Sequence, residues 1–136
     1  MDSVDLSVLR TLHGWQGGAL PLWLVTVVET FGSSPRPQGA MLALRNDGMT
    51  AGSVSGGCIE DDLVLRVQRG QLPGDRCEVV NYGVTNEEAR RFGLPCGGAL
   101  RLVVEPVRNA DWIGRTLQLI EARQRARRVL HLAHCK

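Results

Sequence analysis

The segment that most constrains the fold is a run of small residues between a predicted strand and a predicted helix. Residues 40–45 and 49–54 are largely apolar and flank an Asn-Asp-Gly turn, which predicts a β-hairpin. The hairpin leads into Gly-Ser-Val-Ser-Gly-Gly-Cys at 52–58, and apolar residues at helical spacing follow until Gly70. Glycines at such a junction let backbone N–H groups converge, and the unpaired amides of a first helical turn attract negative charge. We therefore expect an anion-binding loop, to which the two serines add hydroxyl donors.

The remaining pattern predicts one α+β domain with a mixed β-sheet flanked by three or four helices. The chain has 136 residues and is 43% hydrophobic, which suits a single domain with its own core. Residues 129–132 are predicted as one more strand, which either pairs back into the domain or begins a second domain absent from this chain. We accordingly divide the chain into a domain at 1–128 and a terminal segment at 129–136. The predicted strands are 22–30, 40–45, 49–54, 76–82 and 99–105, and the predicted helices are 4–15, one from Cys58 to just before Gly70, 85–92, and one beginning at Asn109 or Asp111.

The charge and composition exclude several classes of function. A formal net charge of +2 and an aromatic fraction of 4% argue against nucleic acid as a partner. The one lysine is Lys136, which excludes a Walker-type phosphate loop and an internal Schiff base. The apolar stretch 19–28 is about half a membrane span, and the N-terminus is acidic, so we expect no membrane span and no signal peptide. We expect a cytoplasmic protein with reduced thiols, with a disulfide between two of the four cysteines as the alternative.

Two thiols lie beside paired glycines. Cys58 is predicted at a helix N-terminus, where the helix end favours a thiolate. Glu60 and its two acidic neighbours in the same turn oppose this, because they raise the pKa of a nearby thiol and repel an anion. Cys96 lies between Pro95 and two glycines, which presents its thiol to a ligand. The alternatives are a small buried cysteine in a tight turn for Cys58 and an incidental loop thiol for Cys96.

Arginine is the other candidate ligand-binding group. Arg36 follows Ser-Ser-Pro in a stiff loop, where a guanidinium suits bidentate capture of phosphate or carboxylate; the alternative is a plain surface turn. Residues 122–128 carry a run of arginines, which is either a solvated helix face or a contact for an acidic partner. The three histidines lie near the chain ends, away from the glycine-flanked thiols, so a Cys–His nucleophile pair has little support. Cys77 alternates with valine on its predicted strand and is expected in the core.

Three segments taken together resemble the XdhC/CoxI family of maturation factors for molybdenum hydroxylases. They are Val-Glu-Thr-Phe-Gly-Ser-Ser-Pro-Arg-Pro at 28–37, Gly-Ser-Val-Ser-Gly-Gly-Cys-Ile-Glu at 52–60, and Phe-Gly-Leu-Pro-Cys-Gly-Gly at 92–98. The likeness is to the N-terminal domain of that family and covers about residues 8–108. Any one glycine-rich segment is weak evidence, whereas three in order are specific.

The resemblance implies a chaperone that binds the molybdenum cofactor (molybdopterin) as cargo, keeps it sulfurated and delivers it to an apo-hydroxylase of the xanthine dehydrogenase or CO dehydrogenase type. It implies no turnover of its own, and it makes a cysteine desulfurase and a second copy of the chain candidate partners. Family members commonly continue into a C-terminal Rossmann-like domain. The residues expected to bind the cofactor are Ser33, Ser34, Arg36, Ser53, Ser55, Gly56, Gly57, Cys58, Glu60, Cys96, Gly97 and Gly98, with Cys58 and Cys96 as the molybdenum contacts.

Two other functions fit parts of the sequence. One is a thiol-dependent sulfur or group transferase with Cys58 or Cys96 as its nucleophile. The other is a non-catalytic interaction module in which the glycines only form tight turns. The cofactor carrier has a spatial requirement that the others lack: the sulfurs of Cys58 and Cys96 must face one pocket, beside amides able to hold an anion.

Overall fold

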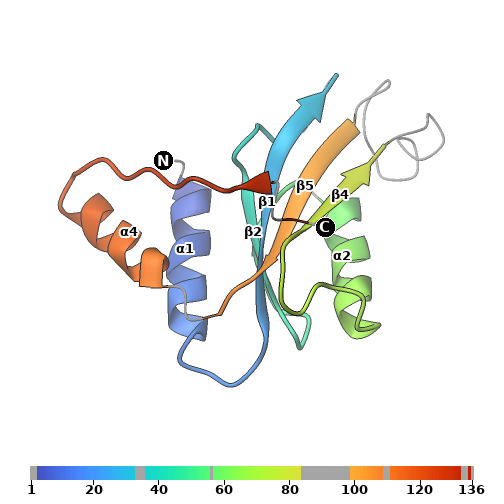
Figure 1. Cartoon of the computed structure of the whole chain (residues 1–136), viewed down its shortest axis with the longest axis horizontal. Helices are drawn as coiled ribbons and strands as arrows, with labels where there is room; N and C mark the ends of the chain where they lie inside the picture. The colour runs from blue at the N-terminus through green and yellow to red at the C-terminus, as the bar shows by residue number, and fades with distance from the viewer. Residues whose placement is uncertain are drawn as a thin grey trace.

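The computed structural model of this chain describes residues 3–32, 36–55, 57–83, 99–108, 111–132 and 135. A five-stranded sheet has the strand order β3-β2-β1-β5-β4, and helices cover both of its faces (Figure 1). The strands are β1 (Leu22–Phe31), β2 (Met41–Arg45), β3 (Thr50–Gly52), β4 (Glu78–Tyr82) and β5 (Ala99–Pro106). The helices are α1 (Ser3–Trp15), α2 (Cys58–Gln68) and α4 (Asp111–Glu121).

The sheet has a separate apolar core on each face. In β1, Trp23, Val25 and Val27 belong to the core that α2 covers, whereas Leu22 and Leu24 belong to the core under α1 and α4. Neighbouring residues of a strand point to opposite faces, so a central strand between two helical layers must be apolar on both sides. Figure 1 shows this three-layer arrangement, with α1 and α4 on one side of the sheet and α2 on the other.

The α+β class is confirmed, and the sheet is antiparallel in each described pairing rather than mixed. The sheet is antiparallel because of the order in which the chain adds its strands. β2 and β3 form a hairpin, and α2 then carries the chain from the β3 edge of the sheet to the β4 edge. β5 inserts between β4 and β1 and runs opposite to both.

Most predicted elements are confirmed to within a few residues. The main difference in the first half is β3, which ends at Gly52 although its strand was predicted to continue to residue 54. Gly52 has a φ of 90°, and a Cβ at this position would lie 2.3 Å from Cγ2 of Val8 and 2.5 Å from the carbonyl oxygen of Met41. The turn at Gly52 thus ends the strand under α1 and directs the chain towards α2. The predicted helix 85–92 lies outside the described residues.

The terminal strand predicted at 129–132 is not formed. After α4, residues 124–131 have no regular secondary structure. Side chains hold this segment instead: Arg128 pairs with Glu105 of β5, and its guanidinium carbon lies 4.2 Å from the ring centre of Trp112. Residues 129–132 can pair as a strand only where a free sheet edge is within reach, and the contacts of Arg128 hold this part of the chain against α4 and β5 instead.

The structure places Cys77 and Cys135 in a disulfide, which corrects the expectation that all four thiols are reduced. Both cysteines are partly exposed, so Cys77 is not a core residue as the strand pattern predicted. The bond joins the chain just before β4 to the terminal segment, across a sequence separation of 58 residues. In the described part of the chain, the longest helices fall short of the length and apolarity that a bilayer span requires.

Candidate functional site

The glycine-rich loop places a thiol at the surface. Cys58 is the first residue of α2 and is exposed, and it is the one free cysteine among the described residues. The next residue, Ile59, is fully buried in the core beneath α2. The helix is therefore anchored on one side of the thiol, while the thiol itself faces solvent.

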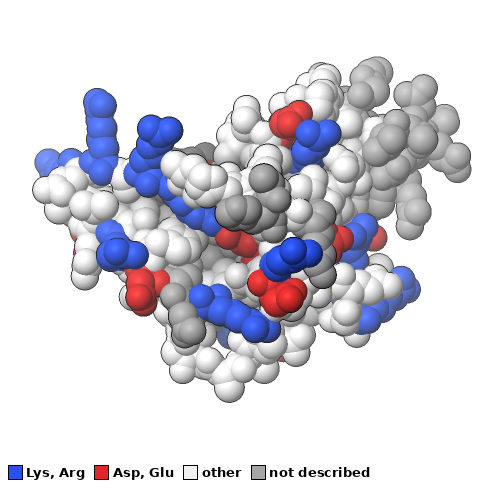
Figure 2. Space-filling view, viewed as in Figure 1, with Lys and Arg blue, Asp and Glu red and all other residues white. Residues whose placement is uncertain are grey.

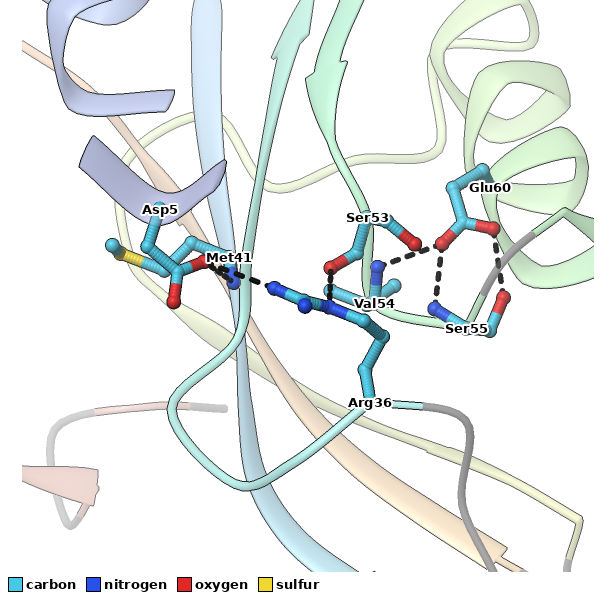
Figure 3. A network of polar contacts seen from close by, with 7 residues as sticks. All are labelled: Asp5, Arg36, Met41, Ser53, Val54, Ser55 and Glu60. Carbon is cyan, nitrogen blue, oxygen red and sulfur yellow. Dashed lines mark hydrogen bonds and ion pairs between the residues drawn. The ribbon is translucent and has the colours of Figure 1, made fainter. Parts of the chain in front are cut away.

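The carboxylate of Glu60 turns back into the loop and binds the amides that were expected to hold an external anion. One carboxylate oxygen accepts hydrogen bonds from the amides of Val54 (2.8 Å) and Ser55 (2.7 Å). The other accepts from the hydroxyl of Ser55 (2.7 Å) and the amide of Gly57 (2.6 Å). Figure 3 shows the contacts of Glu60 with Val54 and Ser55 at the start of the helix. The loop is thus an anion site whose anion is part of the same chain.

The same contacts keep Glu60 ionised. Partial burial by itself raises the pKa of Glu60, but the hydrogen bonds from the Ser55 hydroxyl and from the amides of Val54 and Ser55 outweigh it. The net pKa lies below the ordinary value, because these donors stabilise the charged form. A carboxylate with a lowered pKa is negative at neutral pH, so it competes with any other anion for these amides.

Arg36 is also held by groups of this chain. Its Nη2 lies 3.3 Å from Oδ1 of Asp5, and its Nε donates to the carbonyl oxygen of Ser53 at 3.2 Å. Asp5 belongs to α1 and accepts a further hydrogen bond from the amide of Met41 at 3.0 Å. As Figure 3 shows, Arg36 connects the first turn of α1 to the end of the β3 hairpin. The guanidinium of Arg36, which the sequence predicted as a phosphate ligand, is therefore paired with the carboxylate of Asp5 and holds the loop in place.

The three acidic residues at the start of α2 have different partners. Asp62 accepts a hydrogen bond from the hydroxyl of Tyr82 at 2.6 Å and pairs with Arg66 at 3.1 Å, so it ties α2 to β4. Asp61 is exposed. Glu60 is the one whose carboxylate the structure places on the loop amides. The sequence predicted that the three acidic residues together would oppose an external anion. In the structure, Glu60 is the one that does so, because its carboxylate already binds the loop amides.

The structure brings one part of the predicted site together. Arg36, Ser53, Ser55, Gly57, Cys58 and Glu60 form a continuous region at the start of α2. Ser33, Ser34, Gly56, Cys96, Gly97 and Gly98 lie outside the described residues, so the shared pocket of Cys58 and Cys96 stays a prediction. Within the described ranges, no group of three or more His, Cys, Asp or Glu side chains is placed to hold a metal ion.

Asp5 is the residue of this region that sequence reasoning missed. Its signal was present in the predicted helix 4–15, where Asp5 precedes the apolar residues Val8 and Leu9 by three and four positions. This spacing puts a carboxylate on the apolar face of the helix. A carboxylate in that position needs a cationic or hydrogen-bonding partner, which Arg36 and the Met41 amide supply.

Comparison with known proteins adds independent information. A model of the XdhC and CoxI family matches residues 15–83, which include β1 to β4 and the loop before α2. The molybdenum cofactor insertion chaperone PaoD of Escherichia coli (strain K12) is 35% identical over 103 residues, covering 74% of this chain and 31% of that protein. A probable xanthine dehydrogenase subunit of Bacillus subtilis (strain 168) is 28% identical over 88 residues, covering 62% of this chain and 26% of that protein.

A solved structure has a similar fold. The crystal structure of a xanthine dehydrogenase from Bacillus halodurans matches with a TM-score of 0.68 and 29% sequence identity. The match covers 87% of this chain and 35% of the other one. The chain thus spans between about a quarter and about a third of the length of these relatives.

Proposed function

The chain belongs to the XdhC and CoxI family, and from this we propose that it binds the molybdenum cofactor as cargo and delivers it to an apo molybdenum hydroxylase. In this proposal it is an accessory maturation factor with no turnover of its own. The name of the Escherichia coli relative, a molybdenum cofactor insertion chaperone, supports this role. The Bacillus relatives, named for xanthine dehydrogenase, support a hydroxylase of that type as the recipient.

The observation that carries the proposal is the exposed thiol of Cys58 at the start of α2. Molybdenum in this cofactor is bound by sulfur, and a thiolate is a suitable ligand for a soft metal centre. A carrier must also release its cargo, which favours one or two thiolate contacts over a closed set of four ligands. We assign the first contact to Cys58 and keep Cys96 as the predicted second contact.

The sequence predicted that the loop around Cys58 holds an anion of the cofactor, and the contacts of Glu60 favour a different role for it. Because Glu60 binds the amides of Val54, Ser55 and Gly57, we propose that the loop positions the thiol instead of holding the phosphate of the cofactor. Arg36 acts in the same way, since it pairs with Asp5 and the Ser53 carbonyl. The cofactor contacts predicted at Ser33, Ser34, Gly56, Gly97 and Gly98 remain part of the proposal.

The finer parts of the proposal are protection of the sulfurated form of the cofactor, sulfur supply by a cysteine desulfurase and self-association. We also propose a cytoplasmic location, since the chaperone has to contact the apo-hydroxylase in the compartment where that enzyme receives its cofactor. The disulfide between Cys77 and Cys135 is the feature to test against that location, because disulfides persist mainly in oxidising compartments.

The test is retention of pterin by the purified protein. The chain is co-expressed with the cofactor pathway in a bacterial host, purified, denatured and oxidised, and the released pterin is measured by fluorescence. We expect Cys58→Ser to lose most of the pterin. The double variant Cys77→Ser/Cys135→Ser, which removes two other sulfurs, should retain it. Equal pterin in Cys58→Ser and wild type would contradict the assigned contact, and absence of pterin from every sample would contradict the carrier function.

A further inference from the structure

A groove lies on the side of the sheet opposite to α2. Its volume is about 500 Å³, and it runs between α1, α4 and residues 124–128. Its apolar lining comes from Leu6 and Leu9 of α1, Met41 of β2, and Trp112 and Ile120 of α4. A volume of this size is within the range of small-molecule sites, about 300–1,000 Å³.

Helix α4 has one stripe that is fully buried in the fold and a second one that is only partly buried. Ile113 and Leu117 are buried in the core that α4 shares with α1. Trp112, Thr116 and Ile120 follow each other at intervals of four residues, line the groove and are only partly buried. Side chains four residues apart lie on one face of a helix, so the second stripe forms one wall of the groove.

Arginines form the opposite rim of this groove. Arg125, Arg127 and Arg128 line it from the segment that follows α4. Arg128 is paired with Glu105 and stacked on Trp112, whereas Arg125 and Arg127 are exposed and have no ion pair with the described residues. Figure 2 shows basic side chains gathered over the region where α4 and residues 122–128 lie in Figure 1. The rim therefore carries positive charge beside an apolar wall.

We propose that this groove is a binding site for an amphipathic organic anion. The flat or branched apolar body of such a ligand packs on the Trp112–Ile120 stripe of α4, and its carboxylate, sulfonate or phosphate faces Arg125 and Arg127. Guanidinium groups on an extended segment suit these anions because each presents several N–H donors in a planar fork. The inference does not rest on the proposed cofactor role, because none of the residues that line this groove is among those proposed to bind the cofactor.

The probe is anilinonaphthalene sulfonate, an aromatic anion, compared with its neutral relative N-phenylnaphthylamine. Binding is located by methyl NMR of the three isoleucines: Ile120 lines the groove, whereas Ile59 and Ile113 are fully buried in the two cores. We expect saturable shifts of the Ile120 methyl group with one anion per chain. The anion should bind about tenfold more tightly than the neutral compound, as expected for two partly exposed charge contacts.

Variants separate the anion site from unspecific dye binding. Arg125→Ala/Arg127→Ala should weaken binding of the sulfonate about tenfold and leave the neutral compound unchanged. The charge-matched control is Arg69→Ala/Arg76→Ala, which removes two exposed arginines outside the groove and should change neither affinity. Thr116→Phe, which fills the groove, should weaken both compounds, and thermal unfolding confirms that each variant folds.

Three results would overturn the proposal. They are equal affinity of the two compounds for the wild type, loss of sulfonate binding in the control pair, and ligand shifts at Ile59 that match those at Ile120. Cys58→Ser is expected to bind the sulfonate as well as the wild type. Failure of the cofactor proposal would therefore leave this measurement unchanged, and failure at the groove would leave pterin retention by Cys58 unchanged.

Discussion

At the scale of single residues, Glu60 decides what the glycine-rich loop does. Two oxygens of one carboxylate accept hydrogen bonds from three amides and a hydroxyl of the same loop. From the sequence, the glycines and serines at 52–58 and the helix that follows them predicted a loop that attracts an anion. The sequence did not identify the anion, because whether a carboxylate three residues into a helix turns back depends on the exact path of the preceding turn.

Replacing Glu60 tests whether these contacts hold the loop. Glu60→Gln keeps the shape but removes the charge, so we expect the free energy of unfolding to fall by about 1–3 kcal/mol, as for loss of charge-assisted hydrogen bonds. Urea denaturation followed by circular dichroism measures this change. Glu121→Gln, at the exposed end of α4, is the matched control and should stay within about 0.5 kcal/mol of the wild type. Equal stability of the two variants would show that the loop does not depend on Glu60.

The pH dependence of stability has a defined sign at Glu60. Its pKa in the folded protein is below the ordinary value of 4.5, so its contribution is present above that value and is lost as the pH falls through the lower, folded pKa. Between about pH 5 and about pH 3, the wild type should therefore lose more stability than Glu60→Gln. Urea denaturation across this range measures the difference. Parallel curves for the two proteins would contradict the lowered pKa.

At the scale of helices and strands, hydrophobic periodicity predicted the pieces but not all of their pairings. β1 was identified by its continuous apolar run, and α2 by apolar spacing that ends before Gly70. The strand expected at 129–132 failed because a local preference for extended structure does not supply a partner strand. The antiparallel sheet likewise depends on where α2 carries the chain, which no local pattern specifies.

The junction between β3 and α2 can be tested at Gly52. Gly52→Ala would put a Cβ against Val8 and the Met41 carbonyl at a positive φ, so we expect a loss of at least about 2 kcal/mol of unfolding free energy. Gly74→Ala is the matched control, because a Cβ at Gly74 meets no atom within 4 Å. Thermal unfolding of both variants measures the effect. A Gly52→Ala protein as stable as the control would contradict the close packing of Gly52 against Val8 and the Met41 carbonyl.

At the scale of the whole molecule, the disulfide joins the terminal segment to the sheet. Cysteine spacing could not predict this pairing, since sequence distance does not show which thiols meet in space. In the chain-entropy account, a bond across 58 residues stabilises the fold by up to about 4 kcal/mol. Urea denaturation with and without a reductant should show this loss for the wild type and for Cys58→Ser. The reductant should have no such effect on the stability of Cys77→Ser/Cys135→Ser. If all four cysteines of the native protein could be alkylated without a reductant, the disulfide would be contradicted.

Two regions of the molecule have separate tasks in this account. The start of α2 presents the Cys58 thiol, and the loop that carries it is fixed by Glu60 and, through Asp5 of α1, by Arg36. The face under α1 and α4 holds the arginine-rimmed groove. Sequence motifs pointed to the loop before α2 because its glycines and Cys58 are contiguous in the sequence. They left the groove open, since its lining comes from α1, β2, α4 and the segment after α4 and is assembled only by folding.

The most direct test of the central claim is the rate at which iodoacetamide labels Cys58 in cofactor-loaded and empty protein, followed by peptide mass. The account predicts that bound cofactor protects Cys58 strongly and that its release restores labelling to the rate of the empty protein. The same labelling rate in both samples, with pterin present in the loaded one, would show that the cargo does not contact this thiol.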